Sequence, residues 1–177
     1  PFCKSKCLYC DFNSFAQKDD CIDKYINAVK QEIEKYAQEN KNVLVKTIYI
    51  GGGTPSYIKE KYIKEIIQTL KSNFEINPNA EITIEVNPGT VNKRKLNCYY
   101  EAGMNRLSIG LQSTNDKLLK LIGRVHDFED FLETVKLANT VGFTNINADC
   151  MIGLPNQTIY DVEETLNVLI NLRLTHI

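Results

Sequence analysis

The pattern of apolar and polar side chains predicts a chain in which helices and strands alternate. Apolar residues recur at the helical period over residues 20–39, which predicts an amphipathic helix capped by Asp19 or Asp20. We expect the tyrosines of its apolar face, like Tyr62 further on, to pack in the core. That face comprises Ile22, Tyr25, Ile26, Val29, Ile33, Tyr36 and Ala37. Residues 44–50 form a short apolar run that ends at three glycines, which is typical of a buried strand.

The same alternation continues along the rest of the chain. Further strands are predicted at residues 81–87, 106–112 and 145–152. Further helices are predicted at about residues 58–70 and 93–102, in a stretch that ends at 122, and at about 127–141 and 160–172. Strands that alternate with helices of this length predict βαβ units and a parallel sheet. Because every crossover carries its own helix, we expect an α/β fold, a partial (β/α) barrel of the TIM type.

Both ends of the predicted barrel look incomplete. Four predicted strands are too few to close an eight-stranded barrel. A candidate metal ligand follows Pro1 after only two positions, and the chain reaches Ile177 where a new strand is expected. We therefore expect residues 1–177 to form one core domain that lacks its first strand and its C-terminal region. The first predicted strand would then lie at an open edge of the sheet.

Composition and charge narrow the classes of function. The chain has 21 basic and 22 acidic residues and no block of Lys or Arg, which argues against nucleic acid or an anionic membrane as a partner. No apolar run approaches the roughly 20 residues of a membrane-spanning helix, and no signal peptide is recognisable. Six cysteines in a chain that is neither short nor rich in loops favour a reducing cytoplasm over a secreted disulfide framework.

Three cysteines near the start of the chain carry the clearest chemical signal. Cys3, Cys7 and Cys10 have the spacing C-x3-C-x2-C, which offers three thiolates in one short loop. A metal centre with three protein ligands keeps an open position, which is the mark of a site that binds a ligand. The alternatives are reduced surface thiols, or a zinc site whose fourth ligand is Cys21 or His126. The scattered cysteines are expected to be small buried side chains, namely Cys21, Cys98 and Cys150.

Polar residues and glycines recur where the predicted strands end. Ligands of parallel α/β folds collect at the carboxyl ends of the strands, so these residues are expected to surround one cleft beside the cysteines. They are Gly51, Gly52, Gly53, Thr54, Glu85, Gln112, Ser113 and Asp149. The glycine run matches neither the Walker nor the dinucleotide-binding pattern, and it is either a tight turn or a bare backbone that a ligand approaches closely. Asp149 could instead be a satisfied polar core residue, and His126 is expected at the surface or at a helix cap.

Taken together, the motifs resemble the radical S-adenosylmethionine superfamily, and within it the oxygen-independent coproporphyrinogen III oxidases and the heme chaperones of the HemW type. The matching segments span nearly the whole chain, at residues 1–3, 6–12, 51–56, 85–88, 106–113, 121–126 and 152–158. The resemblance implies a 4Fe–4S cluster on three cysteines, with S-adenosylmethionine chelating the fourth iron. It also implies that the reduced cluster cleaves S-adenosylmethionine into methionine and a 5′-deoxyadenosyl radical.

Carried over position by position, the resemblance implies a complete set of site residues. The cluster ligands would be Cys3, Cys7 and Cys10. Tyr9 would pack on the adenine, and Gly53 and Thr54 would meet the methionine end. The remaining S-adenosylmethionine contacts would be Glu85, Gln112, Arg124 and Asp149, with Arg124 suited to the methionine carboxylate. The family also uses a tyrosine just upstream of the segment that begins at Pro1, a position that this sequence does not contain.

Three functions follow from the resemblance. The oxidases carry a further cysteine shortly after the third ligand, whereas this chain has Asp11 and Phe12, which favours an iron–sulfur heme chaperone of the cytoplasm. The alternative is oxidative decarboxylation of coproporphyrinogen III, in which the radical abstracts hydrogen from a propionate side chain. The third is a non-catalytic, metal-stabilised or electron-transfer module. The implied partners are heme or a porphyrin and an electron donor such as flavodoxin or ferredoxin, and whether the chain is an enzyme stays open.

Overall fold

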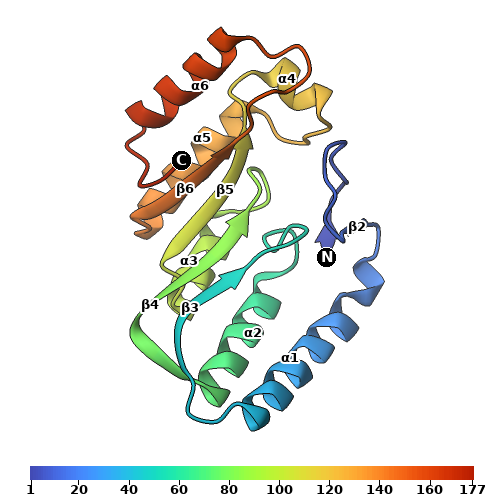
Figure 1. The fold of residues 1–177 in the computed structure, drawn as a ribbon, viewed down its shortest axis with the longest axis vertical. Coiled ribbons are helices and arrows are strands. Elements are labelled where there is room, and N and C mark those ends of the chain that lie inside the picture. Colours follow the sequence, from blue (N-terminus) through green and yellow to red (C-terminus); the bar gives the residue numbers. More distant parts are fainter.

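The computed structural model describes residues 1–177 and contains a four-stranded parallel sheet with helices between its strands (Figure 1). The sheet has the order β3-β4-β5-β6, with β3 at Leu44–Ile50, β4 at Glu75–Val86, β5 at Arg106–Gln112 and β6 at Asn145–Cys150. The helices are α1 (Ile22–Glu39), α2 (Glu60–Asn73), α3 (Lys93–Ala102), α4 (Asp116–Leu121), α5 (Phe128–Val141) and α6 (Ile159–Asn171). This arrangement confirms the predicted α/β architecture with alternating parallel strands and helices.

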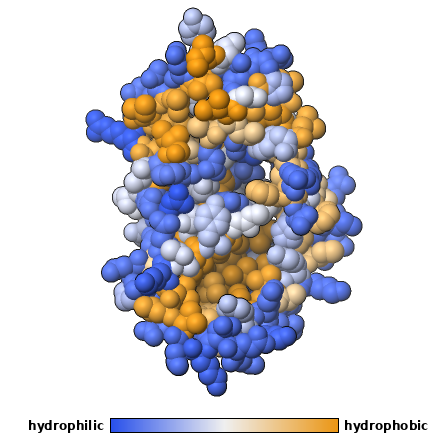
Figure 2. Space-filling model, in the orientation of Figure 1, coloured by the Kyte–Doolittle hydropathy of each residue, from blue (hydrophilic) through white to orange (hydrophobic).

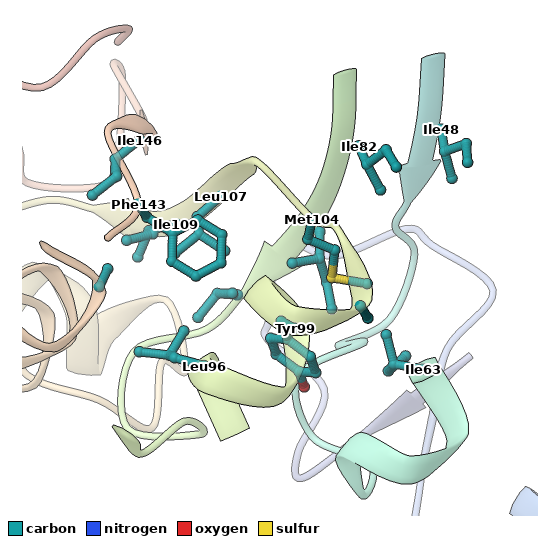
Figure 3. Packing of buried hydrophobic residues seen from close by; sticks show 14 of the residues in the cluster. Ile48, Ile63, Ile82, Leu96, Tyr99, Met104, Leu107, Ile109, Phe143 and Ile146 are labelled. Carbon is teal, nitrogen blue, oxygen red and sulfur yellow. The ribbon is translucent and has the colours of Figure 1, made fainter. Parts of the chain in front are cut away.

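The core lies between the sheet and a row of helices. Helix α1 packs against α2, α2 against α3, and α3 against α5. Figure 3 shows strand side chains such as Ile82 and Leu107 facing Leu96 and Tyr99 of α3. Leu107, Leu96 and Tyr99 are fully buried, so the central strands are anchored from the helix side. Burying a large apolar side chain contributes about 1.5–3 kcal/mol to the stability of the fold.

Strand β3 differs from its predicted environment. A buried strand was expected, but only Ile48 of its seven residues is buried. The reason is its position, because β3 pairs with β4 alone and forms an edge of the sheet, as the expected open edge requires. Beside it lies an apolar groove of about 610 Å³ between β3, α1 and α2, which is visible as an orange hollow in the lower half of Figure 2.

Helix α1 also corrects two details of the prediction. Neither Asp19 nor Asp20 caps it, because both lie in a preceding 3-10 turn and Asp19 instead accepts a hydrogen bond from the hydroxyl of Tyr57 at 2.9 Å. Tyr62 is buried as expected, whereas Tyr25 and Tyr36 are exposed because their side of α1 faces the open groove. The scattered cysteines were expected to be small buried side chains, but Cys21 is exposed and Cys98 and Cys150 are only half-buried.

The loop that carries the three cysteines is held beside the sheet by two very short strands. β1 (Phe2–Cys3) pairs in parallel with β2 (Phe15–Ala16), which closes the loop at its base.

No helix of the chain combines the length and apolar character that crossing a membrane requires.

Candidate functional site

The site residues predicted from the sequence line a single cavity at the carboxyl ends of the strands. Its volume is about 160 Å³, and its walls come from the cysteine loop, the ends of all four strands and the segment after α4. The structure brings together all ten site residues that the resemblance implies: Cys3, Cys7, Tyr9, Cys10, Gly53, Thr54, Glu85, Gln112, Arg124 and Asp149. Gly51, Gly52 and Ser113, which the strand-end pattern also places at this cleft, do not line it. Residues up to 146 positions apart in the sequence therefore line the same cavity. This is expected where parallel strands place their carboxyl ends at one edge of the sheet.

The cysteine loop is fixed to the rest of the site through backbone hydrogen bonds. The N–H of Thr54 donates to the carbonyl of Phe2 at 2.8 Å, which places the glycine turn directly against β1. The N–H of Leu8 donates to the carbonyl of Ile122 at 3.0 Å, which joins the loop to the end of α4. The loop thus has an anchor on each side of the cavity, and the cysteines are presented to it from a defined backbone.

The three cysteines differ in exposure but face the same space. Cys3 is buried, whereas Cys7 and Cys10 are half-buried. No three His, Cys, Asp or Glu side chains converge closely enough to hold a single metal ion. Neither Cys21 nor His126, the two candidates for a fourth zinc ligand, lines the cavity.

Arg124 occupies the centre of the polar wall. One terminal nitrogen, Nη2, donates to Asn87 Oδ1 at 2.8 Å and to the carbonyl of Gly110. The other, Nη1, lies 3.4 Å from the hydroxyl of Tyr9 and 3.8 Å from Cys7 Sγ. Burial raises the pKa of Tyr9, so its phenol stays protonated at neutral pH. The Nε of Arg124 is buried and has no hydrogen-bond partner, so the guanidinium retains one unsatisfied donor at the site.

Glu85 supports the glycine turn from β4. Its Oε2 accepts a hydrogen bond from the N–H of Gly52 at 2.9 Å, and its Oε1 accepts one from the hydroxyl of Tyr49 at 2.8 Å. Burial and the hydrogen bond to Glu85 together raise the pKa of Tyr49 to about 12. The carboxylate is therefore held in place while it still lines the cavity, where it can accept hydrogen bonds from a hydroxyl or ammonium group.

Asp149 belongs to a polar cluster on β5 and β6 that the sequence reasoning did not identify. Asn147 Nδ2 donates to Asp149 Oδ1 at 2.6 Å and to Ser108 Oγ at 2.8 Å, and His176 Nδ1 pairs with Asn147 Oδ1. The sequence contains a signal for this cluster, because residues 147 and 149 are two positions apart in one strand and therefore lie on the same face of the sheet. Ser108 lies directly opposite Asn147 in the pairing of the two strands.

Gln112 has a strained backbone at the end of β5. Its φ is 75°, and only 9% of its surface is exposed. The pairing of β5 with β6 is irregular at this point, and the Gln112 carbonyl accepts a hydrogen bond from the N–H of Met151 at 2.9 Å. A left-handed backbone at a buried residue other than glycine costs about 1–3 kcal/mol, and such strain is concentrated at functional sites.

His126 lies behind the site and is not the surface or capping residue that was expected. It is only 5% exposed, and its Nε2 lies 3.2 Å from the carbonyl oxygen of Leu111, while Nδ1 has no partner. Burial, and then the charge of the nearby Arg124, lower the pKa of His126 from 6.5 to about 4. The side chain is therefore neutral at pH 7.

This environment predicts a loss of stability in mild acid. Between about pH 6.5 and pH 4 the unfolded chain binds a proton at His126 that the folded chain does not, so the folded state loses stability as the pH falls through this window. We expect the free energy of unfolding of the wild type, relative to His126→Gln, to be about 2 kcal/mol lower at about pH 5 than at about pH 7.5. Urea titrations at both pH values measure this. An equal pH dependence in the two proteins would contradict it.

The donor set of the cavity fits an iron–sulfur cluster together with a zwitterionic ligand. The loop supplies three thiols, and the rest of the lining supplies a guanidinium with an unpartnered nitrogen and two carboxylates. Thiolates are the usual protein ligands of such clusters, and Arg pairs well with a carboxylate. When bound, a reduced 4Fe–4S cluster supplies an electron at low potential. The protein's own residues supply the anchoring, the charge complementarity and the shape.

The chain is similar in sequence to one protein superfamily and to curated proteins within it. The family model for the radical SAM superfamily matches residues 1–169. The heme chaperone HemW of Bacillus subtilis is 37% identical over 179 residues, which cover 99% of this chain and 47% of that protein. The oxygen-independent coproporphyrinogen III oxidase of Escherichia coli is 35% identical over 159 residues, which cover 89% of this chain and 35% of that protein.

A solved structure agrees with the fold described above. The coproporphyrinogen III oxidase HemN from Escherichia coli, described as a radical SAM enzyme, matches with a TM-score of 0.89 at 34% identity. The match covers 97% of this chain and 40% of that one. The chain spans about half the length of the curated heme chaperones that it matches.

Proposed function

Because this chain belongs to the radical SAM superfamily, we propose that its cavity binds a 4Fe–4S cluster on Cys3, Cys7 and Cys10, with S-adenosylmethionine beside it. The observation that carries this proposal is the single cavity that all three cysteines and the polar residues of the strand ends line. Three thiolates leave one iron of a cubane cluster open to a ligand that is not protein. That ligand is the reacting molecule in our proposal.

We assign the polar wall to S-adenosylmethionine. The unpartnered Nε of Arg124 suits the methionine carboxylate. The carboxylates of Glu85 and Asp149 suit the ammonium and ribose hydroxyl groups, and Tyr9 offers an aromatic face for the adenine. Gly53, Thr54 and Gln112, which line the cavity at the strand ends, complete the proposed set.

For the protein that carries this sequence, we propose the role of a heme chaperone in the cytoplasm, where thiols stay reduced. Support comes from the curated relatives named as heme chaperones, and from Asp11 and Phe12 in place of the further cysteine of the oxidases. Heme would be the bound cargo, and flavodoxin or ferredoxin the class of electron donor. Oxidation of coproporphyrinogen III is the second candidate. Its support is the match in sequence and structure to the Escherichia coli oxidase.

Anaerobic reconstitution with iron and sulfide tests the site. We expect the reduced protein to give the EPR signal of a 4Fe–4S cluster, and we expect S-adenosylmethionine to change that signal because it binds the open iron. A protein without the cluster signal, or a signal that S-adenosylmethionine leaves unchanged, would contradict the assignment. 5′-Deoxyadenosine, which lacks the amino and carboxylate groups that would bind the open iron, is the ligand control and should leave the signal unchanged.

A second measurement separates the two candidate roles. We expect the full-length protein to bind heme, measured by its absorption spectrum, and to leave coproporphyrinogen III unchanged in an anaerobic assay with S-adenosylmethionine and a reductant. Turnover of coproporphyrinogen III to decarboxylated product would reverse this conclusion in favour of the oxidase. Each result is compared with that of a Cys7→Ala variant, because this substitution removes a proposed cluster ligand and leaves the rest of the chain intact.

A further inference from the structure

Asn87, to which neither the motifs nor the proposed ligand set gives a role, connects two sides of the candidate site. It follows β4 directly, and its side-chain Nδ2 donates to Thr54 Oγ1 at 2.9 Å. Its Oδ1 accepts from Arg124 Nη2 at 2.8 Å. Its backbone N–H donates to the buried Ser56 Oγ at 3.1 Å, which holds the residue in position. A single amide thus spans the gap between the glycine turn and the arginine.

Both partners of Asn87 reach onward to a cysteine sulfur. The hydroxyl of Thr54 donates to Cys3 Sγ at 3.4 Å, within the range of hydrogen bonds to sulfur. Nη1 of Arg124 lies 3.8 Å from Cys7 Sγ. Asn87 and the carbonyl of Gly110 both accept from the other terminal nitrogen of the same planar guanidinium, so together they set the direction in which Nη1 points. Two of the three proposed cluster ligands are therefore approached by donors that share one positioning residue.

The orientation of this network follows from hydrogen-bond chemistry alone. A guanidinium can only donate, so the oxygen of the Asn87 amide must face Arg124 and the NH₂ group must face Thr54. Because the Thr54 oxygen accepts from that NH₂ group, its own hydrogen is free to point at Cys3. An amide is the group that satisfies both ends at once, since a carboxylate at position 87 would take the Thr54 hydrogen for itself.

We propose that Asn87 is a positioning residue that directs the Thr54 hydroxyl at Cys3 and the Arg124 guanidinium at Cys7, and thereby raises the reduction potential of the cluster. The inference rests on the proposed function, because it requires a cluster on these cysteines. Hydrogen bonds to the cluster sulfurs and nearby positive charge stabilise the more negative, reduced state. The buried position of Thr54 strengthens the effect, because its donor is shielded from water.

Redox titration of the reconstituted protein without S-adenosylmethionine tests this proposal. Dithionite adds one electron to each cluster in the presence of mediators, and the EPR signal reports the reduced fraction. We expect Asn87→Ala and Thr54→Val each to lower the ratio of reduced to oxidised cluster about tenfold at a given solution potential, which is about 59 mV for one electron. Asn87→Asp should lower it at least as far, while Thr54→Ser, which keeps the hydroxyl, should restore the wild-type value.

Asn105→Ala is the matched control. Its amide also makes two hydrogen bonds, to the N–H of Ile82 and to the carbonyl of Ala80, but it does not line the site cavity. This variant should lose stability and keep the wild-type potential. An unchanged potential in Asn87→Ala or in Thr54→Val would overturn the inference. If Asn87→Ala does not retain a cluster, the two Thr54 variants decide the question. Failure of the wild type to assemble a cluster would instead count against the proposed function.

Discussion

Replacing any one of Cys3, Cys7 or Cys10 with Ala is expected to abolish assembly of the 4Fe–4S cluster. The proposed cluster has only three protein thiolates as ligands. No fourth cysteine lines the cavity, so a lost ligand cannot be replaced. The loss should be nearly complete for each position, because two remaining thiolates leave two irons exposed. Iron and acid-labile sulfide per chain, measured after anaerobic reconstitution, report this result directly.

Cys98→Ala is the control for these three variants. Cys98 lies on α3, away from the site cavity, and is half-buried. Burial raises the pKa of its thiol, so it is protonated at neutral pH and is a poor ligand for iron. This variant should contain as much iron and sulfide as the wild type. A Cys98→Ala protein without a cluster, or a Cys10→Ala protein with a full one, would contradict the assignment of ligands.

The sequence predicted the framework well where local signals are strong. The bounds of β3, α3 and β5 agree with the prediction, because a glycine or a polar residue follows each element where its pattern ends. Gly103, for example, ends α3 with φ of 100°, as a C-terminal glycine should. The gathering of the site residues was also predictable, since parallel strands place their carboxyl ends at one edge of the sheet.

The features that the sequence did not predict depend on long-range neighbours. The exposure of β3 follows from its place in the strand order, which periodicity does not encode. The burial of His126 depends on β5, where the carbonyl of Leu111 meets its ring. The role proposed for Asn87 depends on Thr54 and Arg124, which lie 33 and 37 positions away in the chain. An amide next to a proline otherwise reads as a turn residue.

Substitutions in the glycine turn are expected to have the second large effect on cluster binding. At one of two adjacent glycines a side chain would meet only backbone strain, whereas at the other it would also collide with neighbouring atoms. Gly52 and Gly53 both have positive φ, at 78° and 53°. A Cβ on Gly52 would have no atom within 4 Å, whereas a Cβ on Gly53 would lie 2.9 Å from the backbone carbon of Pro1 and 3.0 Å from the backbone of Phe2. Backbone atoms in β1 cannot move aside as a flexible side chain can, so Cys3 would move with them.

We therefore expect Gly53→Ala to impair cluster binding far more than Gly52→Ala. Both variants should lose about 1–2 kcal/mol from the left-handed backbone conformation. Gly53→Ala should in addition displace β1, weaken the hydrogen bond from Thr54 to Phe2, and lower cluster affinity about tenfold, as changes next to metal ligands do. Urea unfolding measures the loss of stability that the two variants share. The iron content of each variant at limiting iron measures the difference in their cluster affinity. Equal iron content in the two variants would show that contact between the glycine turn and β1 does not position Cys3.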